Sequence, residues 1–187
     1  MLVSVHDDPL VLVCTDLQVE YLIPGRRHTV LDGDAATMGC LKLLALWRSN
    51  LWPVMHLKRI AQAEWFNPSS RLTDWIAEAK PRPGEMIFEH PLPSAYSSSR
   101  FADYMASNRN VRCVMTGFSF DETILATVVE GFHRSHRYRA ITDAVACRRP
   151  ATGEVAFYKQ SVVNIITSFA TLQSSAELIR TSGAVAV

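Results

Sequence analysis

The chain has 187 residues, of which 48% are hydrophobic, with 19 Lys plus Arg against 18 Asp plus Glu. This length suits one domain over residues 1–187, and the near-zero net charge argues against nucleic acid or an anionic membrane as the main partner. The first ten residues lack the basic and then apolar pattern of a secretory signal, and no uncharged apolar run approaches the roughly 20 residues of a membrane span. We therefore expect a cytoplasmic protein whose ligand is a small molecule.

The cysteines show none of the close spacings that bind zinc; they are Cys14, Cys40, Cys113 and Cys147. Cys14 and Cys113 lie inside apolar runs, so we expect buried, reduced thiols rather than disulfides. No other cluster of residues indicates a metal site, and we expect no cofactor.

The first half of the chain alternates apolar runs with a helical pattern. A strand is predicted at 11–18, a helix at 31–50, and further strands at 52–59 and 85–90. Between the last two lies a long excursion with a short predicted helix at 72–79.

The second half repeats the alternation. The pattern predicts a helix at 97–108, a strand at 111–117, a helix at 121–135, a strand at 138–146 and a helix at 152–169. Buried stripes are expected on the last two helices, from Ile124, Val128 and Phe132 and from Val155, Tyr158, Val162 and Ile166. A weaker signal predicts a final strand at 170–180.

Strands that alternate with long helices predict an α/β fold, a three-layer doubly wound (Rossmann-like), mostly parallel sheet with helices on both faces. Ligands of such sheets bind beyond the carboxyl ends of the strands. The residues at these ends are Asp16 and Gln18, His56 to Arg59, Glu89 and His90, Gly117 to Thr123, and Asp143.

Four segments together resemble the isochorismatase-like hydrolases, which include nicotinamidases and N-carbamoylsarcosine amidohydrolase. They are VLVCTDLQVEYL, GEMIFEHPLPSAYSSSRFADYM, VRCVMTGFSFDETILATVVEGF and YRAITDAVA, in the family's order. The resemblance implies a catalytic Asp after the first strand, a Lys after the third and a Cys at the start of the helix after the fourth. The Asp position is Asp16, the Lys position falls on Glu89, or on His90 if the alignment slips by one, and the Cys position is Thr123.

Thr123 changes the chemistry that the family pattern implies. A cysteine in a first helical turn is activated as a thiolate, whereas a threonine hydroxyl stays protonated and needs a base. Thr123 is best explained as a capping or packing residue, and Thr127 and Gly131 continue a stripe of small residues. A nucleophilic role is the minor alternative.

Glu89 and Asp16 are the second pair of interest. If the two carboxylates face one crevice, one of them should hold a proton and act as a general acid. The isochorismatase branch of the family cleaves a vinyl ether in this way without a cysteine, although it keeps the lysine. A solvated loop position is the ordinary alternative for Glu89.

The remaining expected contacts concern the substrate. Lys58 could restore the lost positive charge, although a solvated lysine is the simpler reading, and His56 is expected in a packed environment rather than at a metal. The backbone of the turn after the fourth strand can bind a carbonyl or carboxylate oxygen. The full set of expected substrate-binding residues is Gln18, Lys58, Tyr96, Gly117, Phe118 and Ser119.

Trp65 and Phe66 are large apolar residues in a polar excursion, and the resemblance implies a lid or a subunit contact there. It also implies a homodimer or tetramer. Two functions stay open: a hydrolase that acts through Asp16 with an altered site, and a catalytically inactive relative that binds a small molecule or protein partner in the same crevice.

Overall fold

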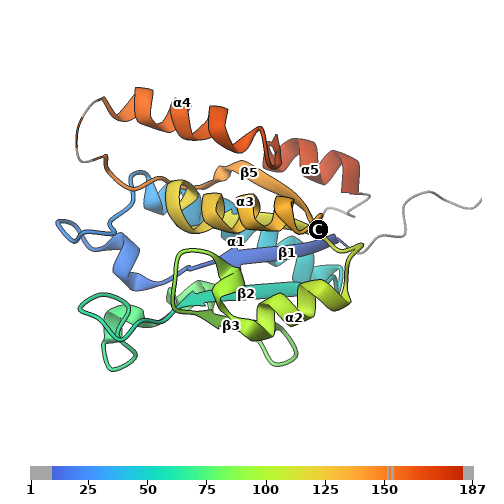
Figure 1. Ribbon diagram of the computed structural model, residues 1–187, viewed down its shortest axis with the longest axis horizontal. Helices are drawn as coiled ribbons and strands as arrows, with labels where there is room; N and C mark the ends of the chain where they lie inside the picture. Colours follow the sequence, from blue (N-terminus) through green and yellow to red (C-terminus); the bar gives the residue numbers. More distant parts are fainter. Residues whose placement is uncertain (1–9, 151, 153, 183–187) are drawn as a thin grey trace, which may run out of the picture.

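The computed structural model describes residues 10–150, 152 and 154–182 as one parallel sheet with helices packed around it (Figure 1). The strands are β1 (Leu10–Thr15), β2 (Val54–Arg59), β3 (Met86–His90), β4 (Arg112–Gly117), β5 (Arg137–Val145) and β6 (Thr171–Gln173). Their order across the sheet is β3-β2-β1-β4-β5-β6, and every neighbouring pair is parallel. The predicted α/β class is confirmed.

The helices are α1 (Gly33–Ser49), α2 (Ser99–Ser107), α3 (Leu125–His133), α4 (Val155–Ile166) and α5 (Ser175–Ser182). Buried side chains of α2, α3 and α4 share one core with one face of the sheet, and those of α1 and α5 share the core on the other face. Figure 1 shows α1 behind the strands and α2 and α3 in front of them. This is the three-layer arrangement that the sequence predicts.

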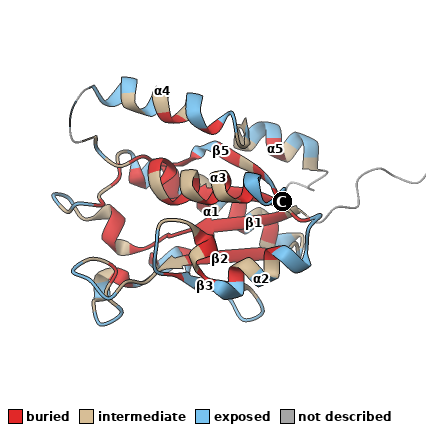
Figure 2. Ribbon diagram, in the orientation of Figure 1, coloured by how far each residue is buried: buried red, intermediate tan, exposed pale blue. Residues whose placement is uncertain are grey.

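The two cores follow from the alternation of side chains along buried strands. In β1, Val11 and Val13 face the α3 core, whereas Leu12 and Cys14 face the α1 core. A strand buried on both faces needs a continuous apolar run, which the sequence of β1 supplies. Figure 2 shows β1 and β2 buried along most of their length.

Several predicted elements differ in detail. In place of a helix at 72–79 there are two 3₁₀ turns, Arg71–Thr73 and Ala77–Ala79, and the final strand stops at Gln173, after which α5 begins. Phe132 is 51% exposed and Val155 is 42% exposed, so both predicted stripes are wrong at one position. Each residue lies in a terminal turn of its helix.

The chain leaves β1 for β2 and β3 on one side and returns through β4 to the other side of β1. The carboxyl ends of β1 and β4 therefore flank the point where the strand order reverses, which is where such sheets bind ligands. After β4 the chain makes a π-helical turn, Phe120–Ile124, that continues into α3. None of the described helices combines the length and apolar character needed to cross a membrane.

Candidate functional site

Asp16 is the centre of the polar cluster at the strand-order reversal. It follows β1 directly, its backbone N–H donates to the carbonyl of Leu57 on β2 (3.0 Å), and it has a left-handed φ of +45°. Aspartate tolerates this conformation better than most residues do. The side chain has no exposed surface, so its carboxyl group depends on protein groups for hydrogen bonds.

His90, the last residue of β3, forms the first of these bonds. Its Nε2 lies 2.8 Å from Asp16 Oδ1, and its Nδ1 lies 2.7 Å from the carbonyl oxygen of Leu92. A carbonyl only accepts, so Nδ1 must carry a hydrogen and donate it. One proton then remains for the contact between Nε2 and Oδ1. The pair is either an imidazolium with a carboxylate or a neutral imidazole with a carboxylic acid, and its net charge is zero in both forms.

Two hydroxyl groups bind the other carboxylate oxygen. Thr123 Oγ1 donates to Asp16 Oδ2 at 2.9 Å, and the Tyr21 hydroxyl donates to the same oxygen at 3.2 Å. Burial, and then the charge of Asp16, raises the pKa of the Tyr21 phenol well above its usual value, so Tyr21 keeps its proton. Thr123 therefore does not cap backbone donors, because its hydroxyl is directed to Asp16.

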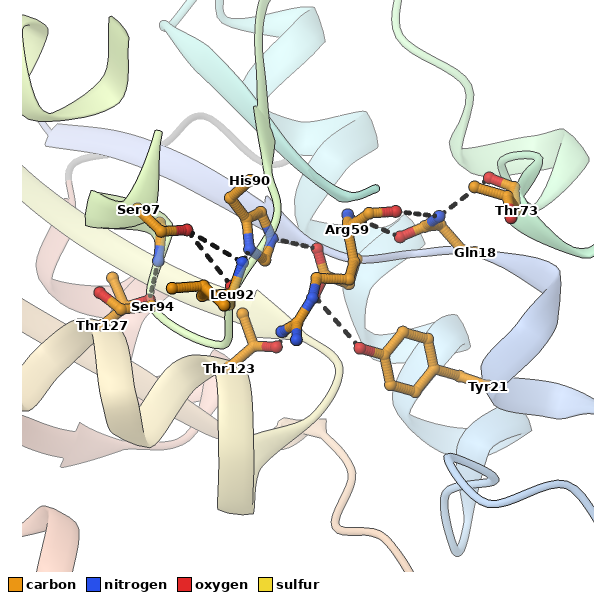
Figure 3. Close-up of polar contacts among 12 residues, drawn as sticks. Gln18, Tyr21, Arg59, Thr73, His90, Leu92, Ser94, Ser97, Thr123 and Thr127 are labelled. Atoms are coloured by element: carbon orange, nitrogen blue, oxygen red, sulfur yellow. Dashed lines mark hydrogen bonds and ion pairs between the residues drawn. The ribbon is translucent and has the colours of Figure 1, made fainter. Parts of the chain in front are cut away.

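The segment after β3 fixes the imidazole of His90 (Figure 3). Ser97 Oγ accepts a hydrogen bond from the backbone N–H of Leu92 (3.1 Å), the residue whose carbonyl binds Nδ1. The same segment is tied to α3, because the backbone N–H of Ala95 donates to Thr127 Oγ1 at 2.9 Å. Thr127, expected only as a small packing residue, thus helps to hold the segment that orients His90.

The structure corrects the expectation for Glu89. Successive side chains of a strand point to opposite faces, so only one of Glu89 and His90 can face the start of α3. His90 does so and is fully buried, whereas Glu89 is exposed on the opposite face of the strand. His90, the position given by the alternative alignment, is therefore the residue that contacts Asp16. The expected pair of carboxylates, Asp16 with Glu89, does not form.

The expectation that Lys58 binds substrate is corrected for the same reason. It is the register partner of Glu89, and its ammonium lies 5.5 Å from the centre of the Trp75 ring. The register partner of His90 is Arg59, which shares the face of His90. Figure 3 shows the Arg59 side chain running toward Thr123 and Tyr21. In the sequence, Arg59 is only one of several residues at the end of a strand, and no motif marks Tyr21 as a residue of the site.

Gln18 holds the strand ends together. Its amide nitrogen donates to the carbonyls of Arg59 (3.0 Å) and Thr73 (2.9 Å), and its amide oxygen accepts from the backbone N–H of Arg59 (2.9 Å). With both ends of the amide engaged and no exposed surface, Gln18 positions Arg59 instead of facing a ligand.

The turn after β4 packs closely against β1. Gly117 has a φ of +97°, and a Cβ atom there would lie 2.1 Å from the carbonyl oxygen of Thr15. Phe118 is buried, with its ring 5.6 Å from that of Tyr21. Ser119 is also buried, and its hydroxyl has no partner among the described residues. Only backbone and packing roles are visible for Gly117 and Phe118.

Tyr96 belongs to a different cluster. Its hydroxyl lies 2.6 Å from that of Tyr138 and 2.5 Å from Nδ1 of His136. Tyr138 is near the start of β5, so this cluster lies at the opposite end of the sheet from Asp16. Tyr96 does not join the groups around Asp16.

The excursion after β2 covers the site from one side. Phe66 is 3% exposed and packs on Tyr21, with 5.1 Å between ring centres, and His28 lies between Phe66 and Trp65. His28 also pairs with Glu122 at 3.5 Å. Burial opposes the charge of Glu122, but His28 and Arg148 outweigh it and lower its pKa.

The other expectations concern residues away from Asp16. His56 is buried between Glu85 (2.8 Å) and the ring of Trp75, and Asp143 accepts hydrogen bonds from the start of α5 at Ser175. All the cysteines are buried and unpaired. Over the described part of the chain, no group of three or more His, Cys, Asp or Glu side chains is arranged to hold a metal.

Comparison with known proteins agrees with this fold. The family model described as isochorismatase domain matches residues 10–177. Solved structures of similar fold include an isochorismatase from Pseudomonas putida (21% identity, covering 91% of this chain and 90% of that one, TM-score 0.83). Another is an isochorismatase family protein from Desulfovibrio vulgaris (18% identity, covering 94% of this chain and 99% of that one, TM-score 0.81). A third is N-carbamoylsarcosine amidase from Thermoplasma acidophilum (20% identity, covering 89% of this chain and 96% of that one, TM-score 0.72). A search of curated proteins gives no match.

Proposed function

Because the chain belongs to the isochorismatase family, we propose that it is a hydrolase of a small carbonyl, amide or enol-ether substrate in which Asp16 transfers the proton. In this proposal the positions of the family's Lys and Cys are occupied by His90 and Thr123. The observation that carries it is the pair of bonds to one buried carboxyl group, from His90 to Oδ1 at 2.8 Å and from Thr123 to Oδ2 at 2.9 Å.

The favoured reaction is cleavage of an enol ether, because it needs an acid and no thiol. In the neutral form of the pair, Asp16 holds the proton and His90 Nε2 accepts its hydrogen bond. Transfer of this proton to the vinyl carbon leaves an oxocarbenium ion and the carboxylate of Asp16. Water then adds to the cation and returns a proton to the pair, and the hemiketal breaks down to a carbonyl compound and an alcohol.

The surrounding groups suit this proton transfer. The hydroxyls of Thr123 and Tyr21 both donate to Oδ2, so they stabilise the carboxylate that forms when the proton leaves. The His90 pair stays neutral overall before transfer, as a pair with lysine would. Because none of these side chains has exposed surface, a substrate has to enter past the residues that cover them, among which is Phe66.

Thr123 has a positioning role in this proposal. Its hydroxyl donates its hydrogen to Asp16, and Asp16 in its ionised form could remove that proton and make Thr123 a nucleophile toward an amide. The enol-ether route avoids this harder step. Thr123 therefore orients Asp16 and is not itself attacked or acylated.

The test is a turnover screen of the purified chain on small amides, ureas and vinyl ethers, with products detected by mass spectrometry. We expect hydrolysis of at least one vinyl ether, and a loss of at least about a hundredfold in Asp16→Asn, the usual contribution of a general acid. An unchanged rate in Asp16→Asn would refute the proposal.

Two neighbouring residues of β3 provide a matched control. His90→Gln should lower turnover strongly, whereas Glu89→Gln, one residue away on the exposed face, should leave it unchanged. If no compound in the screen is hydrolysed, the second function gains support: an inactive relative that binds a small molecule or protein partner in the same crevice.

A further inference from the structure

Arg59 is a cation at the site without an acidic partner. Arg26, Arg48, Arg134 and Arg148 each pair with a carboxylate at 3.2 Å or less. Among the described residues, no carboxylate lies within 4.0 Å of the Arg59 guanidinium, and its Nε is buried with no hydrogen-bond acceptor. A buried N–H of a charged group without an acceptor is costly, so this position favours an acceptor from outside the chain.

The surroundings hold Arg59 in place and direct it to the site. Gln18 binds its backbone on both sides, and the guanidinium lies 5.8 Å from the centre of the Phe66 ring. Its charge acts on both the Tyr21 phenol and the Glu122 carboxylate. Arg59 is partly exposed, whereas Asp16 and Tyr21 are closed to solvent, so it is the site cation that an entering molecule can reach.

Asp16 does not need Arg59 as a counterion. Its Oδ1 is bound by His90, and its Oδ2 by Thr123 and Tyr21. The guanidinium is therefore available for a second group of the substrate, away from the atoms that receive the proton.

We propose that Arg59 binds the carboxylate of the substrate, so that the site selects small organic carboxylates over their neutral amides. This inference rests on the proposed function only in calling the bound molecule a substrate, because binding of a carboxylate does not require turnover. A guanidinium matches a carboxylate with two parallel N–H bonds, which fixes the orientation of the bound molecule as well as its affinity.

The charges nearby favour an anion over a neutral group. The carboxylate of Glu122 is kept ionised by His28 and Arg148 and lies close enough to Arg59 for their charges to interact. A phosphate group, with about −1.5 to −2 charges at neutral pH, scales the attraction to Arg59 and the repulsion from Glu122 alike, so these charges do not separate it from a carboxylate. A neutral amide, in contrast, gains little from the guanidinium.

The experiment is calorimetric titration of the wild-type chain with benzoate and benzamide, which share one ring. We expect benzoate to bind at least about tenfold more tightly than benzamide, as charge-assisted bonds to a guanidinium imply. Equal affinity for benzoate and benzamide would overturn the proposal without any variant.

Variants then assign the effect to the residue. Arg59→Gln should remove the preference for benzoate, and Lys58→Gln, a change at the adjacent residue on the Trp75 face, should keep it. If Arg59→Gln does not fold, Arg59→Lys should retain only part of the preference, since it cannot form two parallel bonds. A preference that survives in the folded Arg59 variant contradicts the proposal. Asp16→Asn separates the two proposals, because it should abolish turnover and still distinguish benzoate from benzamide.

Discussion

At the residue scale, the most consequential feature is the histidine that contacts Asp16. A lysine ammonium in this place would bring a fixed positive charge, whereas His90 with its Nδ1 hydrogen bonded to Leu92 shares one proton with Asp16. The Asp16 and His90 pair can therefore exist with the acid protonated at no cost in net charge. This property suits a site that donates a proton better than one that must keep a nucleophile ionised.

Thr123 offers a direct test of its positioning role. Thr123→Val keeps the shape and removes the hydroxyl, so Asp16 Oδ2 retains only the Tyr21 donor. We expect turnover to fall by about tenfold, the effect of one hydrogen bond to a charged group, and Thr123→Ser to restore it. A loss of a thousandfold or more, measured by steady-state kinetics, would instead identify the hydroxyl as the nucleophile.

The cysteines should take no part in turnover. Burial raises the pKa of the thiols of Cys40, Cys113 and Cys147 to about 12, and that of Cys14 is raised further, so little thiolate exists at neutral pH. Iodoacetamide should therefore leave activity intact, and mass spectrometry should detect labelled thiols only after denaturation. Rapid inactivation traced to one thiol of the folded protein would show that the site assignment is wrong.

At the element scale, the turn between β4 and α3 depends on Gly117. Gly117 and Gly84 both have positive φ, of +97° and +91°, but only at Gly117 would a Cβ atom meet backbone, 2.1 Å from Thr15 O. Alanine at Gly84 should cost about 1 kcal/mol for its backbone conformation alone. At Gly117 the clash with β1 should raise the cost to at least about 3 kcal/mol.

The measurement for this pair is chemical denaturation of both glycine variants beside the wild type. The two substitutions share the conformational term, so the difference between them reports the contact with Thr15. Similar losses of unfolding free energy in the two variants would mean that the turn does not pack against β1 in this way.

The elements also show what sequence alone can and cannot predict. Strand alternation with long helices was enough for the sheet, its parallel direction and the place of Asp16 at a strand end. The face of a strand-end residue was not predictable, because a register error of one residue exchanges the two faces. This is why the sequence places the Lys position on Glu89 with His90 as the alternative, and singles out Lys58 but not Arg59. Tyr21 was missed because its contact with Asp16 depends on a turn with no sequence signature.

At the scale of the whole molecule, a charged network joins α1, β2 and the segment before β3. Glu85 accepts two bonds from Arg48 (2.7 and 2.8 Å), one from the backbone N–H of Arg82 (2.8 Å) and one from neutral His56 (2.8 Å). Burial opposes ionisation, but these donors outweigh it and lower the pKa of Glu85 from 4.5 to about 2. Burial also lowers the pKa of His56, which keeps the imidazole neutral.

This network predicts the response of stability to acid. A carboxylate with a depressed pKa contributes stability that is fully present above pH 4.5 and is lost as the pH falls toward 2. A buried neutral histidine acts in the same direction below its usual value of 6.5. Glu85→Gln should therefore lower the unfolding free energy at pH 7 by about 2 to 3 kcal/mol and flatten its dependence between pH 4.5 and 2. Chemical denaturation of the wild type and of Glu85→Gln between pH 7 and pH 2 checks this prediction. Unfolding free energies that change in parallel with pH in the two proteins would contradict it.

The central claim is that Asp16 and His90 share one proton because Leu92 fixes the hydrogen on Nδ1. The most direct measurement is nitrogen NMR of the His90 imidazole, with Asp16→Asn as the comparison. We predict a protonated Nδ1 at every pH at which the protein is folded, and an Nε2 signal that changes when Asp16 is replaced. An unprotonated Nδ1, or an Nε2 signal that does not respond to Asp16→Asn, would contradict the shared proton and the mechanism that depends on it.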